Sequence, residues 1–107
     1  MPDILVTQDD QGRTFEANQG NLIVIRLEEN PTTGYEWELD AIDSPVLELL
    51  DSDYSQHPGV LMGRGGTRTL RFRAKSSGSQ QVRLRLRRSW DPEDVAVEHF
   101  DVNIRVK

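Results

Sequence analysis

The sequence predicts an all-β domain, and two observations support this fold class. Apolar residues alternate with polar ones along most of the chain, with the period of two that sends successive side chains of a strand to opposite faces. Between the alternating runs lie short turn-forming segments: QG, NPTTG, DSP, HPG, GRGG, KSSGS and WDPED. Many short strands separated in this way are typical of a sandwich or a barrel.

The elements follow in order from this alternation. A short opening strand is expected around Ile4 and Val6, and another over residues 46–54, where Asp51 to Asp53 make a long helix unfavourable. The other strands have apolar sets that should share one face each: Ile23, Ile25 and Leu27; Tyr35, Trp37 and Leu39; Leu70, Phe72 and Ala74; Val82, Leu84 and Leu86; Phe100, Val102, Ile104 and Val106.

Length and composition limit the classes of protein to which this chain can belong. A chain of 107 residues predicts one domain over residues 1–107. Hydrophobic content of 36% and charged content of 29% indicate an ordered soluble protein rather than a disordered or membrane-embedded one. No apolar run approaches the roughly 20 residues that a membrane-spanning helix needs.

The charge distribution does not favour a nucleic-acid partner. The net charge is −5, whereas nucleic-acid-binding domains usually present a basic surface. All charged residues from Arg64 to Arg88 are nevertheless basic, and acids dominate the first half of the chain. We interpret these acidic and basic residues as partners in cross-strand ion pairs, in preference to a binding site for a polyanion. The expected partners are Glu36 and Glu38 with Arg83, Arg85 and Arg87, and Glu48, Asp51 and Asp53 with Arg68, Arg71 and Arg73.

The sequence offers little for catalysis or for a metal or cofactor. There is no cysteine, and neither His57 nor His99 belongs to a metal-ligand spacing. The pairs Glu28-Glu29 and Glu93-Asp94 are interpreted as solvated loop charges rather than an acid/base couple. GRGG lacks the following GK[ST] of a phosphate-binding loop. We therefore expect no catalytic residue, no metal and no cofactor.

The segment NPTTGY, from Asn30 to Tyr35, contains two threonines that a simple turn does not require. Pro31 fixes φ, Gly34 allows a positive φ and Asn30 can bond to the backbone ahead. Thr32 and Thr33 are not explained in this way, because β-branched residues suit a tight turn poorly unless the loop is rigid and its side chains are used.

Two further connections carry residues suited to contact. Leu61 and Met62 stand just before the glycines of GRGG, although surface loops do not ordinarily present large apolar side chains. In RSWDP, Trp90 is either a core residue that continues the inward face of the preceding strand or a side chain at a chain reversal. Together the three connections suggest a binding edge.

These residues resemble the chagasin-type inhibitors of papain-like cysteine proteases. The resemblance covers nearly the whole chain in the order and spacing of elements. It rests on NPTTGY at 30–35, LMGRGG at 61–66 and RSW at 88–90. The third motif departs from the family's usual Arg-Pro-Trp, because Ser89 stands in place of proline and serine does not fix φ.

The resemblance implies an immunoglobulin-like antiparallel β-sandwich of about seven to eight strands, with the three loops at one end. It implies a reversible, tight-binding inhibitor, not an enzyme, that occludes the active-site cleft. Thr32 and Thr33 would sit over the catalytic cysteine and histidine, Met62 or Leu61 would enter the apolar specificity pocket, and Trp90 would stack on aromatic residues of the protease. The implied protease-binding residues are Asn30, Pro31, Thr32, Thr33, Gly34, Tyr35, Leu61, Met62, Gly63, Arg64, Gly65, Gly66, Arg88 and Trp90.

The expected partner is therefore a papain-like cysteine protease, with no nucleic acid and no membrane, and the chain is expected to be a monomer. Family members often act in or beyond the bacterial envelope, and a bacterial source is expected. The start MPDILVTQDD shows no signal peptide, so the protein is periplasmic or secreted if a leader was removed and otherwise cytoplasmic. The alternatives are an immunoglobulin-like adhesion or carbohydrate-binding module, with aromatic residues exposed along a strand, and a small enzyme.

Overall fold

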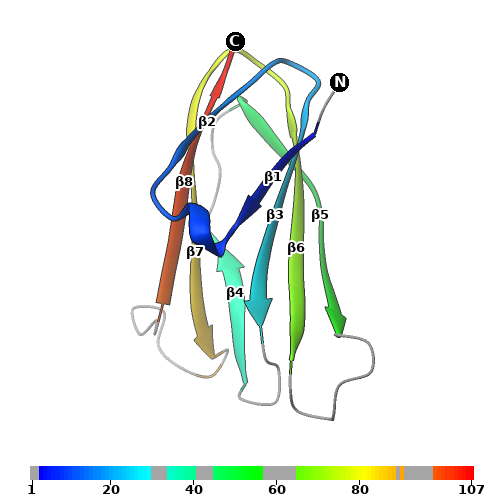
Figure 1. Ribbon diagram of the computed structural model, residues 1–107, viewed down its shortest axis with the longest axis vertical. Coiled ribbons are helices and arrows are strands. Elements are labelled where there is room, and N and C mark those ends of the chain that lie inside the picture. The colour runs from blue at the N-terminus through cyan, green and yellow to red at the C-terminus, as the bar shows by residue number, and fades with distance from the viewer. Residues whose placement is uncertain (1–2, 30–33, 41–44, 57–64, 89, 91–97) are drawn as a thin grey trace.

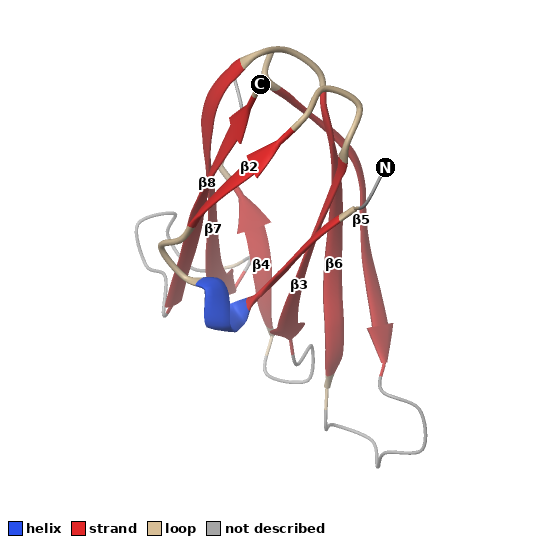
Figure 2. Cartoon of the chain, turned by 45° about the horizontal axis from the view of Figure 1, so that its top comes forward, coloured by secondary structure: helices blue, strands red, loops and turns tan. Residues whose placement is uncertain are grey.

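The computed structural model describes residues 3–29, 34–40, 45–56, 65–88, 90 and 98–107, and these form strands with one short 3₁₀ helix, η1 (Gln8–Asp10) (Figure 2). The strands are β1 (Ile4–Thr7), β2 (Thr14–Ala17), β3 (Leu22–Glu29), β4 (Tyr35–Leu39), β5 (Leu47–Gln56), β6 (Gly66–Ala74), β7 (Gly78–Arg88) and β8 (Glu98–Val106). The all-β prediction is confirmed, and β2 is an additional strand that the alternation did not predict. None of the described residues belongs to a helix long and apolar enough to cross a membrane.

The strands form two four-stranded sheets, ordered β1-β3-β6-β5 and β2-β8-β7-β4, which face each other as a sandwich (Figure 1). The four longer pairings, β3–β6, β5–β6, β4–β7 and β7–β8, are antiparallel as expected. The short strands β1 and β2 instead pair in parallel with β3 and β8, so both sheets are mixed. Alternation assigns a residue to a face but carries no information on the direction of the neighbouring strand.

The core lies between the sheets and contains the predicted inward-facing side chains. Phe72, Ile23 and Ile25 are fully buried, and so are Val82 and Val102 of the second sheet. Complete burial of such a side chain contributes about 1.5–3 kcal/mol relative to leaving it exposed. The alternating pattern therefore accounts for most of the apolar burial that holds the two sheets together.

Several of the outward charges pair across strands, as the sequence predicted. Arg87 Nη1 lies 2.7 Å from Glu38 Oε2, and Arg71 Nη1 lies 2.9 Å from Asp51 Oδ1. The interpretation as cross-strand pairs is thus confirmed for these residues. Arg68 is an exception, because its guanidinium binds Glu29 rather than an acid of β5.

Glu29 is the main correction to the sequence-based expectations. It was expected to be a solvated loop charge, yet its side chain is only 1% exposed. Glu29 Oε1 accepts hydrogen bonds from the Trp37 backbone N–H at 2.8 Å and from Arg68 Nε at 3.2 Å, and Oε2 accepts one from Arg68 Nη2 at 2.8 Å. The hydrogen bond to Glu29 raises the pKa of the Arg68 guanidinium above its ordinary value, because it favours the charged form. Glu29 continues the inward row of Ile23 to Leu27, and for this reason it is buried.

We expect Glu29→Gln to lower the free energy of unfolding by about 2–4 kcal/mol, because it leaves the largely buried Arg68 cation without its counter-charge. Chemical denaturation measures this change. The matched control is Glu48→Gln, whose carboxylate lies 3.8 Å from Lys75 with both side chains half exposed, and it should cost less than about 0.5 kcal/mol. Equal costs for the two variants would contradict a structural role for the buried pair.

Candidate functional site

The three connections singled out in the sequence all start and end at one end of the sandwich (Figure 1). In one sheet Gly66 pairs with both Glu29 and Gln56, and in the other Tyr35 pairs with Arg88. The strand ends that flank residues 30–34, 57–65 and 89–97 are therefore aligned. The predicted site residues Asn30, Pro31, Thr32, Thr33, Leu61, Met62, Gly63 and Arg64 lie outside the described residues.

The base of the NPTTGY segment is joined by two hydrogen bonds across the sandwich. The chain passes here from β3 in one sheet to β4 in the other. The Trp37 N–H donates to the Glu29 carboxylate at 2.8 Å, and the Trp37 indole Nε1–H donates to the Glu28 carbonyl at 2.9 Å. Both ends of the segment are thus held together by contacts between β3 and β4.

The two glycines that end the LMGRGG segment lie at its base. Gly66 begins β6 and forms ladder pairs on both sides, and Gly65 precedes it with φ of +86°. Both residues are buried. A positive φ at Gly65 is a conformation that residues with a side chain rarely adopt, which explains a glycine at this position.

Trp90 is exposed, and the interpretation as a core residue is excluded. β7 ends at Arg88, and 67% of Trp90 is accessible to solvent. The six-membered ring of its indole lies against Gly34, which has φ of +83°. A Cβ at position 34 would overlap Cη2 of Trp90 and lie 3.1 Å from Cζ2. The NPTTGY and RSW motifs therefore meet at Gly34 and Trp90.

Arg88 contacts aromatic rings of both motifs. Its guanidinium carbon lies 5.1 Å from the centroid of the Tyr35 ring and 5.5 Å from that of the Trp90 ring. Both distances are within the range of cation–π attraction. Tyr35 and Arg88 are direct cross-strand partners in β4 and β7, so their side chains lie on the same face of the sheet.

The other aromatic side chains do not form an exposed platform along a strand. Trp37, Phe72 and Phe100 are buried, and the remaining Phe and Tyr side chains are partly buried. The adhesion or carbohydrate-binding alternative required aromatic residues exposed along a strand, and Trp90 stands beyond the end of β7. The distribution therefore favours a contact at the loop end of the sandwich.

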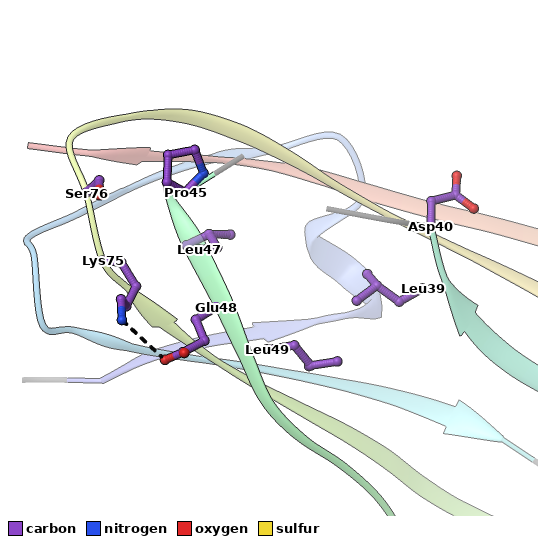
Figure 3. Close-up of a pocket in the computed structure, with 8 residues that line it drawn as sticks. All are labelled: Leu39, Asp40, Pro45, Leu47, Glu48, Leu49, Lys75 and Ser76. Atoms are coloured by element: carbon purple, nitrogen blue, oxygen red, sulfur yellow. Dashed lines mark ion pairs between the residues drawn. The ribbon is translucent and has the colours of Figure 1, made fainter. Parts of the chain in front are cut away.

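A hollow of about 620 Å³ lies away from this end, where β4 finishes and β5 begins (Figure 3). Leu39, Leu47 and Leu49 line its apolar part, and Lys75 and Glu48 form an ion pair at 3.8 Å. Within the part of the chain that the structure describes, no three His, Cys, Asp or Glu side chains could together hold a metal ion.

The chain matches the family model described as Chagasin family peptidase inhibitor I42 over residues 16–104. It belongs to the chagasin family. It is 30% identical over 104 residues to chagasin of Trypanosoma cruzi, with 94% of each chain covered. The family consists of peptidase inhibitors rather than enzymes, which confirms the resemblance and the expectation that the chain is not an enzyme. The expectation of a bacterial source stays a prediction, since the curated relatives are from protozoa.

Two solved structures share the fold of this chagasin-family chain. The crystal structure of the cysteine protease inhibitor EhICP2 from Entamoeba histolytica has a TM-score of 0.84 at 18% identity, covering 97% of this chain and 94% of that one. The structure of PbICP-C in complex with falcipain-2 has a TM-score of 0.60 at 18% identity, covering 100% and 96%. The immunoglobulin-like sandwich expected from the resemblance is confirmed.

Sequence reasoning missed Glu29 and Arg68, which shape the base of the site. The inward position of both residues can be recognised in the sequence. Glu29 continues the inward row of β3, and Arg68 continues the inward row of Leu70 and Phe72 in the neighbouring strand β6. Two opposite charges in inward phase on adjacent strands indicate a buried pair.

We expect Gly34→Ala to displace the Trp90 indole while leaving the protein folded, because the ring end is the movable neighbour of the new Cβ. Acrylamide should then quench Trp90 fluorescence more strongly. Gly12→Ala is the matched control, since Gly12 has a similar φ of +78° and no atom within 4 Å of an added Cβ. Each variant should lose about 1–2 kcal/mol of stability through backbone strain. Equal quenching in both would contradict the contact between Trp90 and Gly34.

Proposed function

We propose that this chain is a reversible, tight-binding inhibitor of papain-like cysteine proteases, acting as a monomer through one inhibitor domain over residues 1–107. The segments 30–35, 61–66 and 88–90 would together occlude the active-site cleft. The observation that carries this proposal is the alignment of their flanking strand ends at one end of the sandwich, with an exposed Trp90 packed on Gly34. Membership of a family of peptidase inhibitors supports it.

In this proposal each segment has its own role. Asn30, Pro31, Thr32 and Thr33 enter the cleft, with the two threonines over the catalytic cysteine and histidine. Leu61 or Met62 fills the apolar specificity pocket, while Gly63 and Arg64 run along the substrate groove and let backbone approach backbone. Trp90 stacks on aromatic residues on the opposite side of the cleft.

The described part of the site lowers the entropic cost of binding a protease. The hydrogen bonds of Glu29 and Trp37 hold the base of the NPTTGY segment before any partner arrives. A segment fixed in this way loses less conformational entropy on binding. The neighbour PbICP-C, which was solved in complex with falcipain-2, gives further support for a protease partner.

The first test is a titration of the purified protein against papain and a cathepsin L-type protease with a fluorogenic peptide. We expect stoichiometric, reversible inhibition by the wild type and at least about tenfold weaker inhibition by the double variant Thr32→Ala, Thr33→Ala. Thr14→Ala, exposed on β2, is the control and should inhibit like the wild type. No inhibition of either enzyme at micromolar concentration by the folded wild type would overturn the proposal.

Trp90→Ala should weaken binding by about 2 kcal/mol or more, because an exposed tryptophan at an interface is a typical energetic hot spot. Stability should change little, since most of the indole is already in contact with water. Leu5→Ala removes another exposed apolar side chain, on β1, and serves as control. An inhibition constant unchanged by Trp90→Ala would assign Trp90 to the framework instead.

A further inference from the structure

Arg88 links the NPTTGY and RSW motifs through the two aromatic rings that it contacts. Tyr35 belongs to the first motif and Trp90 to the second, and the guanidinium carbon of Arg88 lies 5.1 Å and 5.5 Å from their centroids. The cross-strand pairing of Tyr35 with Arg88 fixes one side of this arrangement, because both residues belong to the β4–β7 ladder. Because Arg88 is itself held in this ladder, its contact with the Trp90 ring can fix the position of the indole.

The Trp90 indole needs such a contact to be held in place. It stands beyond the last residue of β7, and residue 89 is a serine, which does not restrict its own φ. Gly34 supplies a flat surface for the six-membered ring, but a glycine offers no side chain to hold it. Arg88 adds an attraction toward the ring face from a residue that is itself held in the sheet.

We propose that Arg88 is a positioning residue that holds Trp90 against Gly34, so that the two motifs meet a protease as one preassembled surface. The positioning is a property of the free chain, and its effect on inhibition rests on the proposed function. With 67% of Trp90 still exposed, most of the indole remains available to a partner. The ordering of this side chain is then complete before binding, which lowers the entropic cost of association.

The decisive measurement on the free protein is the NMR shift of the Gly34 α-protons. An aromatic ring packed on Gly34 should move these protons away from ordinary glycine values. In Arg88→Met, which removes the cation and keeps an unbranched side chain, we expect most of this displacement to be lost. The control Arg73→Met makes the same change on an exposed residue of β6 that pairs with Leu22 and Glu48, and it should keep the displacement.

Two further measurements distinguish a lost contact between Trp90 and Gly34 from misfolding of the variant. The Trp37 indole N–H, bonded to the Glu28 carbonyl, should keep its signal in every folded variant. Arg88→Lys retains a cation and should keep more of the Gly34 displacement than Arg88→Met. A full displacement in folded Arg88→Met would overturn the proposal.

Inhibition of papain then separates positioning from direct contact. We expect Arg88→Met to weaken inhibition about three- to tenfold, and the double variant Arg88→Met, Trp90→Ala to inhibit no worse than Trp90→Ala alone. Additive losses would mean that Arg88 contacts the protease by itself, which would overturn the claim that Arg88 acts on inhibition through Trp90. If the wild type inhibits neither enzyme, the proposed function fails, while the Gly34 shift still decides whether Arg88 positions Trp90.

Discussion

The buried carboxylate of Glu29 is the constraint on which the loop end of the sandwich depends. A charge removed from water must be met by hydrogen bonds and an opposite charge, and Glu29 obtains both from Trp37 and Arg68. These partners belong to different sheets, so satisfying one carboxylate also fixes where the chain crosses from β3 to β4. The conformation at the base of the NPTTGY segment is thus a consequence of electrostatics as much as of turn chemistry.

The same contact closes part of an open sheet edge. β4 is the edge strand of its sheet, and a backbone N–H at such an edge is free to pair with another chain. The Glu29 side chain accepts the Trp37 N–H in place of a neighbouring strand. A single buried acid therefore satisfies an edge donor, pairs with a cation and defines one base of the site.

The alternating pattern accounts for much of this structure. Since the side-chain period of a strand is two, the apolar rows of β3, β6, β7 and β8 could be assigned to one face, and the outward acids and arginines could be paired across strands. The three candidate segments could also be located, because Gly, Pro and β-branched residues in a turn constrain it chemically. The interpretation of Glu29 as a solvated loop charge is wrong, because Glu29 continues the inward row of β3.

What the sequence by itself determined is the all-β class, the inward rows and the positions of the three connections, because each depends on residues close together in the chain. Only the tertiary structure decided that β1 and β2 pair in parallel, that Glu29 and Arg68 meet, and that Trp90 packs on Gly34. These features join residues from distant segments or different strands. Their geometry follows from how the two sheets pack, and local periodicity carries no information about it.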